Sequence, residues 1–185
     1  MKYLVTISLL LLASVVYGSG ETADSSSGSV CFLTGSWTSC DSIFTSDNIR
    51  ATTTSASTVM ADSGYSFSLT SLDSFRVLVE GNGTAFVGGQ RDINVWFSQG
   101  GTSYGDTVTI GLPRNTDAVV IASGTTNGLW GTGFDETDLN NGTTAVRIRA
   151  DAGLVGTIKV DHVQIEAWYT VAGGSHGQVI RVRSY

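Results

Sequence analysis

Proline and charged side chains are scarce in this chain of 185 residues. It contains a single proline, and Asp, Glu, Lys and Arg together make up only 14%. Beyond the apolar N-terminal segment, no long stretch repeats apolar residues with the period of an amphipathic helix. A fold dominated by helices is therefore not expected.

Basic side chains are fewer than acidic ones. The chain has 10 Lys and Arg against 16 Asp and Glu, which gives a net charge of -6 at pH 7. Most of such a surface repels a polyanion, so nucleic acid is not an expected partner. Moderate acidity of this kind is also common in exported proteins.

Residues that carry catalysis or bind metals are few and poorly spaced. There are two histidines and two cysteines, and the sequence has neither His-Glu-x-x-His nor Gly-x-Ser-x-Gly. Asp161 and His162 are adjacent, and neighbours on a strand point to opposite faces, so they do not form an acid–base pair without a bulge. We therefore expect no catalytic residue, no metal, no cofactor and no enzyme.

The acidic segment 135–141 admits two interpretations. Its side-chain oxygens could bind calcium, but the spacing and central glycine of an EF-hand are missing. The preferred interpretation is a short helical turn over 135–140, in which Thr132 caps the start and Gly142 closes the end. The residues concerned are Asp135, Glu136, Asp138, Asn140 and Asn141.

The N-terminus has the layout of a secretory signal peptide over residues 1–18. A basic start at Lys2 precedes the apolar run Tyr3–Val16, and Val16 and Gly18 suit the -3 and -1 positions of a cleavage site. The run is short for a membrane span. These features predict a secreted, extracellular chain that begins near Ser19 and has no membrane segment after processing.

Cys31 and Cys40 fit that compartment, because two cysteines in an exported chain usually pair. A disulfide across this short loop would contribute about 2.5–3 kcal/mol on the chain-entropy model. Asn82 and Asn141 each begin an Asn-Gly-Thr sequence. Both are glycosylation acceptors, and both also suit a hairpin turn, so the two interpretations stay open.

Apolar residues alternate with polar ones along most of the remaining chain. This period of two indicates eight or nine short strands, joined by turns rich in Gly, Ser and Asn. The fold class is therefore all-β, an antiparallel, jelly-roll-like β-sandwich. The predicted strands lie within 48–54, 65–69, 75–79, 93–98, 108–112, 118–122, 144–150 and 157–170.

The last two of these strands carry further expectations. Thr144–Ala150 and Thr157–Thr170 follow each other closely, so we expect them to pair. In the second strand, Ile158 and Val160 have one parity, whereas Val163 and Ile165 have the other. A change of buried face requires an irregularity, so the pattern predicts a bulge near Asp161–His162 or burial on both sides.

Four segments make up the predicted organisation. The signal peptide (1–18) precedes a flexible tether (19–30), the β-sandwich domain (31–172) and a C-terminal strand behind a glycine-rich link (173–185). This last strand either pairs in its own sheet or adds to the sheet edge of a neighbouring copy. Its contact residues would be Val179, Ile180, Arg181, Val182 and Arg183.

Aromatic side chains are the remaining candidates for binding. Trp130, beside Gly131, is interpreted as a plug at a corner of the core. Trp96 and Trp168 are out of phase with the apolar residues of their strands, which places them outside. With Tyr104, they could stack on cell-surface glycans or contact a partner protein. Trp37 is a further aromatic that could act as a platform.

Several motifs together resemble a jelly-roll-like domain of phage virion proteins and of bacterial or environmental secreted surface proteins. The likeness spans about 41–170 and implies a structural or binding module without catalytic residues. The leader and the cysteine pair depart from a virion protein and favour a secreted appendage or surface layer. The motifs are Ser46-Asp47, Gly64–Phe67, Leu129-Trp130-Gly131, Asp138-Leu-Asn140 and Val160–Thr170.

Two functions are compatible with these observations. The first is a secreted, non-enzymatic subunit of an extracellular filament, appendage or surface layer, whose partners are copies of itself joined by strand addition. The alternative is a carbohydrate-binding or adhesive surface module. The two differ in whether the exposed aromatic residues and the C-terminal strand contact glycans or other subunits.

Overall fold

The computed structural model describes residues 19–24, 37–56, 58–85, 91–100, 102–124, 129–131, 133–151 and 156–169. The predicted signal peptide and the C-terminal strand 173–185 lie outside these ranges. Within them, no helix is both long enough and apolar enough to cross a membrane.

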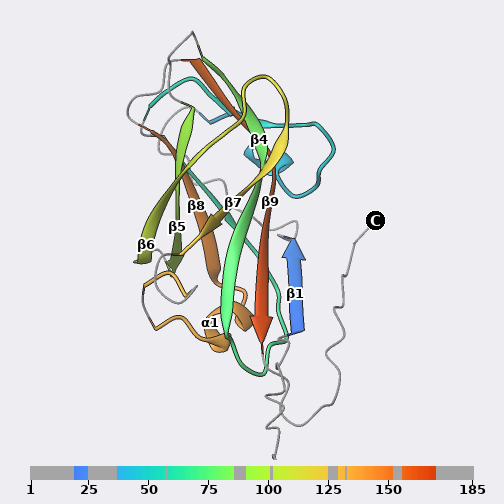
Figure 1. Ribbon diagram of the computed structural model, residues 1–185, viewed down its shortest axis with the longest axis vertical. Helices are drawn as coiled ribbons and strands as arrows, with labels where there is room; N and C mark the ends of the chain where they lie inside the picture. The colour runs from blue at the N-terminus through green and yellow to red at the C-terminus, as the bar shows by residue number, and fades with distance from the viewer. Residues whose placement is uncertain are drawn as a thin grey trace, which may run out of the picture.

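Two antiparallel sheets form a β-sandwich, as the sequence predicts (Figure 1). Sheet A has the order β1-β9-β4-β7, with β2 also pairing along β9, and sheet B has the order β3-β8-β5-β6. From β2 onward the chain passes between the sheets at nearly every connection, which makes this a jelly roll. The strands are β1 Ser19–Asp24, β2 Ala51–Thr53, β3 Val59–Ser63, β4 Ser74–Ala85, β5 Asp92–Gln99, β6 Thr102–Gly111, β7 Ala118–Ser123, β8 Thr144–Ala150 and β9 Gly156–Tyr169.

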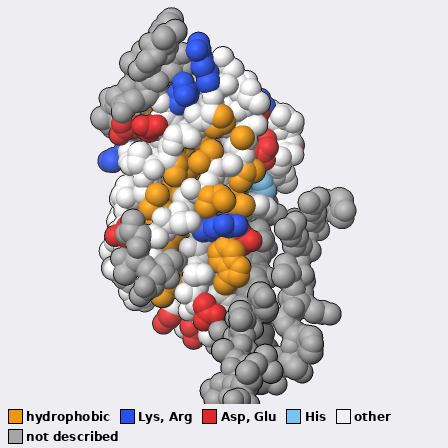
Figure 2. Space-filling view, in the orientation of Figure 1, with side chains coloured by type: hydrophobic (Ala, Val, Ile, Leu, Met, Phe, Trp, Pro, Cys, Tyr) orange, Lys and Arg blue, Asp and Glu red, His pale blue; other side chains and the backbone are white. Residues whose placement is uncertain are grey.

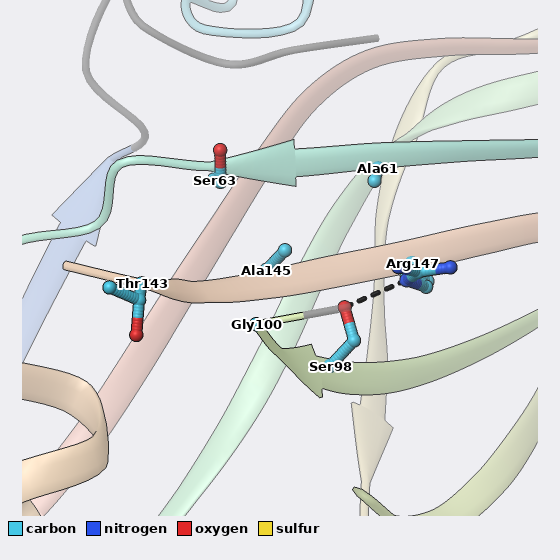
Figure 3. A pocket seen from close by; sticks show the side chains of 7 residues that line it. All are labelled: Ala61, Ser63, Ser98, Gly100, Thr143, Ala145 and Arg147. Atoms are coloured by element: carbon cyan, nitrogen blue, oxygen red, sulfur yellow. Dashed lines mark hydrogen bonds between the residues drawn. The ribbon is translucent and has the colours of Figure 1, made fainter. Parts of the chain in front are cut away.

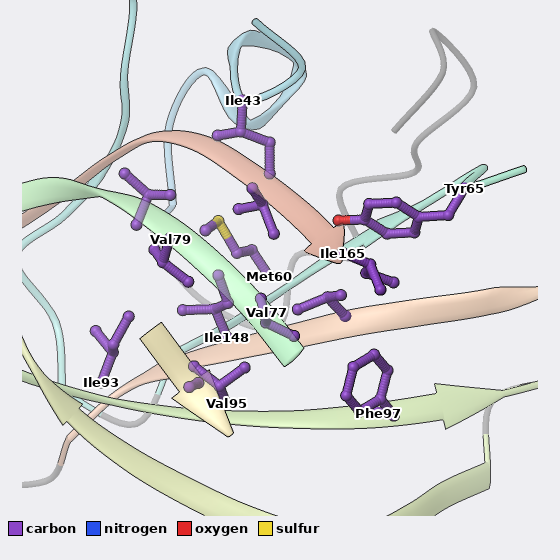
Figure 4. Packing of buried hydrophobic residues seen from close by; sticks show 14 of the residues in the cluster. Ile43, Met60, Tyr65, Val77, Val79, Ile93, Val95, Phe97, Ile148 and Ile165 are labelled. Atoms are coloured by element: carbon purple, nitrogen blue, oxygen red, sulfur yellow. The ribbon is translucent and has the colours of Figure 1, made fainter. Parts of the chain in front are cut away.

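The core lies between the sheets and is filled by the residues of one parity from each strand. Figure 4 shows side chains of both sheets pointing toward one another across this layer. The alternation predicted from the sequence is confirmed there, because Val77, Val79, Ile93, Val95, Phe97, Val146, Ile148 and Ile165 are all 0% exposed. Full burial of one such side chain stabilises the fold by about 1.5–3 kcal/mol.

The predicted pairing of the last two strands is wrong. β8 pairs with β3 and β5 in sheet B, whereas β9 pairs with β1, β2 and β4 in sheet A. The chain crosses from one sheet to the other between Ala150 and Gly156. Proximity in sequence favours a hairpin, but in a jelly roll consecutive strands mostly belong to different sheets.

The predicted irregularity in the last strand is confirmed. The register of β4 and β9 shifts so that Glu80 faces His162 and the next residue, Gly81, faces Val160. Asp161 is the extra residue of this bulge and is 1% exposed. The bulge is what allows Val160 and Val163, of opposite parity, both to point into the core.

Gly81 is required by this bulge. A Cβ at this position would lie 2.3 Å from the backbone oxygen of Lys159. The hairpin turn that the sequence allowed at Asn82 does not form, since β4 continues through this residue to Ala85. Only a residue without a side chain allows the two strands to approach so closely.

Trp130 closes one corner of the core, in agreement with the sequence analysis. It is 0% exposed, and its backbone adopts a φ of 55°. Its ring centre lies 4.8 Å from that of Phe97, and its carbonyl accepts a hydrogen bond from Asp106 N–H at 2.8 Å. A Cβ at Gly105 would lie 1.9 Å from that same carbonyl, so a glycine precedes Asp106.

Three local expectations differ from the structure. Residues 64–69 bury Tyr65, Phe67 and Leu69 but form no strand. β2 is shorter than predicted, and Ile49 before it is 59% exposed. The predicted tether begins as a strand, since β1 pairs with β9 by its backbone, whereas 25–30 lie outside the described residues.

The single α-helix of the described residues, α1, spans Glu136–Asn140 at one end of the sandwich (Figure 1). Its N-cap is Asp135, not Thr132 as predicted. The Asp135 side chain accepts hydrogen bonds from the backbone N–H groups of Thr137 and Asp138, and the Asp138 carboxylate accepts one from the backbone N–H of Asp135. This capping box satisfies donors that a helix start leaves open.

Candidate functional site

The tryptophans divide into two buried and two partly exposed residues. Trp37 and Trp130 are 3% and 0% exposed, which excludes them as surface platforms. Trp96 lies on the outer face of sheet B and Trp168 on the outer face of sheet A, both half-buried. The prediction that these two face outward is confirmed, but the structure places them on opposite sides of the sandwich.

Tyr104, the third predicted aromatic contact, lies in β6 opposite Phe97 of β5. Its side chain is outside the described part of the structure. Its backbone position puts it near the Trp96 end of sheet B and far in the fold from Trp168, which belongs to sheet A.

Trp96 lies among polar side chains on the outer face of sheet B. Its indole N–H donates to the hydroxyl of Ser103 at 3.2 Å, which fixes one edge of the ring. The guanidinium carbon of Arg149 lies 5.7 Å from the ring centre. Arg147 lies directly opposite Trp96 in the β5–β8 register. The ring therefore keeps an exposed part, bordered by hydroxyl and guanidinium groups.

A hollow of about 410 Å³ lies on this face, and one of its lining residues is Arg147, the cross-strand neighbour of Trp96 (Figure 3). Ser63, Ala145 and Ser98 lie opposite one another across β3, β8 and β5, and all are small. Small side chains in one cross-strand row, next to a row with large ones, leave the surface hollowed. The lining residues are Ala61, Ser63, Ser98, Gly100, Thr143, Ala145 and Arg147.

Arg147 lines this hollow and lies opposite Trp96 on the neighbouring strand. Its Nε donates to the hydroxyl of Ser98 at 2.7 Å, drawn as the dashed line in Figure 3. Ser98 is only 2% exposed, so the hydrogen bond anchors the guanidinium at a fixed place. The remaining nitrogens of Arg147 are available to a bound molecule. A carbohydrate site needs this combination of an aromatic ring with fixed polar donors and acceptors.

The sequence analysis missed the residues of the hollow. Ala145, Arg147 and Arg149 alternate with the buried residues of β8 and so face away from the core. Which outward residues lie side by side depends on the strand register, and the chain alone gives no register for strands that are far apart in sequence.

The outer face of sheet A is more hydrophobic. Figure 2 shows hydrophobic side chains gathered across this side of the molecule, with acidic and basic groups among them. Val119 and Ile121 on the edge strand β7 are 53% and 45% exposed, and Leu78 of β4 lies opposite Ile121.

Trp168 lies on this same face beneath a basic side chain. The guanidinium carbon of Arg76 is 4.9 Å from the ring centre of Trp168, and Arg76 forms an ion pair with Glu166 at 2.7 Å. Trp168 is therefore covered by an arginine whose charge is already neutralised.

A second polar cluster surrounds the bulge at Asp161. Burial raises the pKa of this carboxyl, and the backbone N–H of Asn48 opposes the rise by hydrogen bonding to it. Nearby, Arg50 forms an ion pair with Asp117, and this hydrogen-bonded partner raises the pKa of Arg50. The Asn82 amide also donates to Asp117. These contacts fasten the loop before β2 to sheet A.

The acidic segment around α1 is occupied by structural hydrogen bonds. Asp138 accepts from the side chain of Gln99 at 2.9 Å, and Asn140 binds both backbone groups of Leu69. In the described part of the chain, no three His, Cys, Asp or Glu side chains are grouped so that they could hold a metal ion. Asp135 and Asp138 thus act as helix-capping residues.

The remaining predicted site residues have mixed outcomes. Cys40 is 5% exposed, and the described residues include no free cysteine; Cys31 lies outside them, so the Cys31–Cys40 pair stays a prediction. Asn82 is 6% exposed within β4, where the folded chain does not present it for glycosylation. Asn141 is exposed after α1 and stays a candidate. The predicted contacts at 179–183 lie outside the described residues.

Comparisons with known proteins give little beyond the fold. No family model matches the chain, and no curated protein matches it. A solved structure described as a xylan-binding module CBM15 is similar in fold, with a TM-score of 0.38 and 16% sequence identity. The match covers 82% of this chain and 92% of that one. At these values the likeness says nothing about what this chain binds.

Proposed function

We propose that this protein is a secreted carbohydrate-binding module whose site is the outer face of sheet B. The observation that carries the proposal is the position of Trp96, which is partly exposed and lies opposite Arg147, a lining residue of the 410 Å³ hollow. A sugar ring has an apolar face that stacks on an indole and a rim of hydroxyls that need hydrogen-bonding partners. Ser103 and Arg147 supply such partners at fixed positions.

The test is binding to a panel of soluble polysaccharides, measured by affinity electrophoresis and titration calorimetry. Replacing Trp96 by Ala should weaken binding by about tenfold or more, as loss of a central aromatic contact does. Trp168→Ala is the matched control, because it removes the same side chain from the opposite face. Equal effects of the two substitutions would contradict the proposed location.

A second variant tests the hollow separately from the ring. Ala145→Leu adds volume on the outer face without touching the core, since Ala145 points away from Val146 and Ile148. We expect a folded protein with weakened binding. If no saturable binding to any polysaccharide is found for the wild-type chain, the proposed function itself is wrong.

Self-assembly into an extracellular filament or surface layer is the second candidate. The exposed Val119 and Ile121 on the edge strand β7 favour it, since an edge with unpaired backbone groups and apolar side chains suits an added strand. The added strand would be Val179–Arg183 of a neighbouring copy, whose Ile180 and Val182 share one face.

Its test is the size of the native protein, seen by negative-stain microscopy and light scattering. Removal of Gly173–Tyr185 should leave a folded monomer, and Ile121→Lys should have the same effect from the receiving side. Ile49→Lys is the control, because Ile49 is also exposed, at 59% against 45% for Ile121, but lies before β2. A truncated protein that still polymerises would refute this mechanism.

A further inference from the structure

Each outer face of the sandwich carries an arginine close to a tryptophan ring, but in the part of the chain that the structure describes only the arginine on sheet A is paired with a carboxylate. On sheet A, Arg76 lies over Trp168 and is neutralised by Glu166. On sheet B, Arg149 lies near the ring of Trp96, and Arg147 stands opposite that ring in the next strand. Among the described residues, Asn94 of β5 lies opposite Arg149, where Glu166 lies opposite Arg76 on sheet A.

The charge of Arg147 and Arg149 is therefore not compensated locally. Across the described ranges, the salt bridges join Arg50 to Asp117 and Arg76 to Glu166, and neither arginine of β8 takes part in one. Both project from the same face of β8, two residues apart, which corresponds to roughly 6.6 Å along a strand. In a chain of net charge -6, this is a local basic surface.

Arg147 is also held in place for a ligand. Its Nε bond to the buried Ser98 hydroxyl fixes the guanidinium, and Arg147 both lines the hollow and lies opposite Trp96 in the strand register. A planar guanidinium binds a carboxylate through two parallel hydrogen bonds, and such charge-assisted bonds are about twice as strong as neutral ones. A neutral sugar would leave this capacity unused.

We propose that the carbohydrate bound by this face carries a carboxylate, so that the ligand is a uronate-containing polysaccharide. The sugar ring stacks on Trp96, and its carboxylate binds Arg147 and Arg149, as Glu166 binds Arg76 on the opposite sheet. The inference rests on the proposed function and adds the chemical class of the ligand to it.

The experiment compares polygalacturonate with its fully methyl-esterified form, which keeps the sugar chain and removes the charge. We expect the wild-type protein to bind the acid at least about tenfold more tightly, which corresponds to roughly 1.4 kcal/mol. Raising the salt concentration from roughly 50 to roughly 300 mM screens charge–charge attraction, so it should weaken binding to the acid and leave binding to the ester unchanged.

Two substitutions separate the contributions of the arginines. Arg149 is exposed, so Arg149→Gln should preserve the fold. Arg147→Gln removes the guanidinium that Ser98 anchors. Each should lower the preference for the acid by about tenfold, as loss of a hydrogen bond to a charged group does. Arg114→Gln is the control, since it removes the same charge from an exposed position outside this face. Thermal unfolding of each variant confirms that it is folded.

The possible outcomes distinguish the inference from the proposed function. Binding of acid and ester with equal affinity, lost in Trp96→Ala, would overturn the carboxylate assignment and leave the glycan site intact. Preference for dextran sulfate over polygalacturonate would also overturn it, in favour of sulfate esters. An acid preference that persists in both arginine variants would contradict the roles given to Arg147 and Arg149.

Discussion

The indole N–H of Trp130 donates a hydrogen bond to the backbone carbonyl of Phe75, with 3.3 Å between the nitrogen and the oxygen. Trp130 follows β7 in the chain and Phe75 lies in β4, so this bond ties a connecting loop to the central part of sheet A. The two rings also stack, with their centres 6.3 Å apart.

Replacing Trp130 by Ala should therefore lower the free energy of unfolding by about 3–5 kcal/mol, since it leaves a cavity in the core and an unpaired carbonyl. Urea denaturation followed by circular dichroism measures the change. Trp96→Ala is the control, because the same atoms are removed from a half-buried surface position, and its loss should be smaller by more than half. Comparable losses would show that Trp130 does not close the core.

Gly81→Ala should destabilise the fold by about 1–3 kcal/mol, the range typical of forced overpacking. The added Cβ would meet the Lys159 oxygen at 2.3 Å and push β4 away from β9 at the bulge. Gly133→Ala is matched to it, since a Cβ there has nothing within 4 Å. If both variants unfold at the same urea concentration, the close approach of the strands is not a constraint.

Asp161→Asn should raise the melting temperature at pH 7. Burial raises the pKa of Asp161 in the folded protein above its value in the unfolded chain. The folded state then binds the proton more tightly, so stability is greatest below the unfolded pKa and falls as pH rises through the folded pKa. A neutral amide removes this loss and can still accept the hydrogen bond from Asn48.

The measurement is a series of thermal melts between acid and neutral pH on both proteins. The difference between them should vanish at the acid end, where Asp161 is protonated in either state, and grow toward neutrality. Asp117→Asn serves as a contrast: it breaks the ion pair with Arg50 and should lower stability near neutrality. A variant less stable than the wild type at pH 7 would mean that the Asp161 charge is favourable where it lies.

Asp135→Ala should cost about 1 kcal/mol of stability, as removal of a helix N-cap generally does. Its side chain accepts bonds from Thr137 and Asp138, which no alanine can replace. Glu136→Ala tests charge alone, because Glu136 lies in the first turn of α1 but makes no capping bond, and we expect a change of only a few tenths of a kcal/mol. Urea denaturation of both variants compares the two effects, and equal losses would point to charge and not to capping.

The alternation of apolar and polar residues in the sequence was sufficient to predict the fold class, an antiparallel β-sandwich. Val77 and Val79 are apolar residues two positions apart, as are Ile93 and Val95. This spacing of two fixes which side of each strand is buried. The parity change in β9 even predicted the bulge at Asp161, since apolar residues on both parities cannot reach one core without an extra residue. Trp96 and Trp168 were placed outside on the same grounds.

The sequence alone determined that this chain is an antiparallel sandwich with two outward tryptophans, because burial of alternating side chains is a local property of each strand. Only the tertiary structure decided that β8 and β9 lie in different sheets and that Trp96 and Trp168 face apart. It also brought Ser63, Ser98 and Arg147 around one hollow. These relations depend on strand register and sheet order, which follow from the packing of the whole core and not from any one segment.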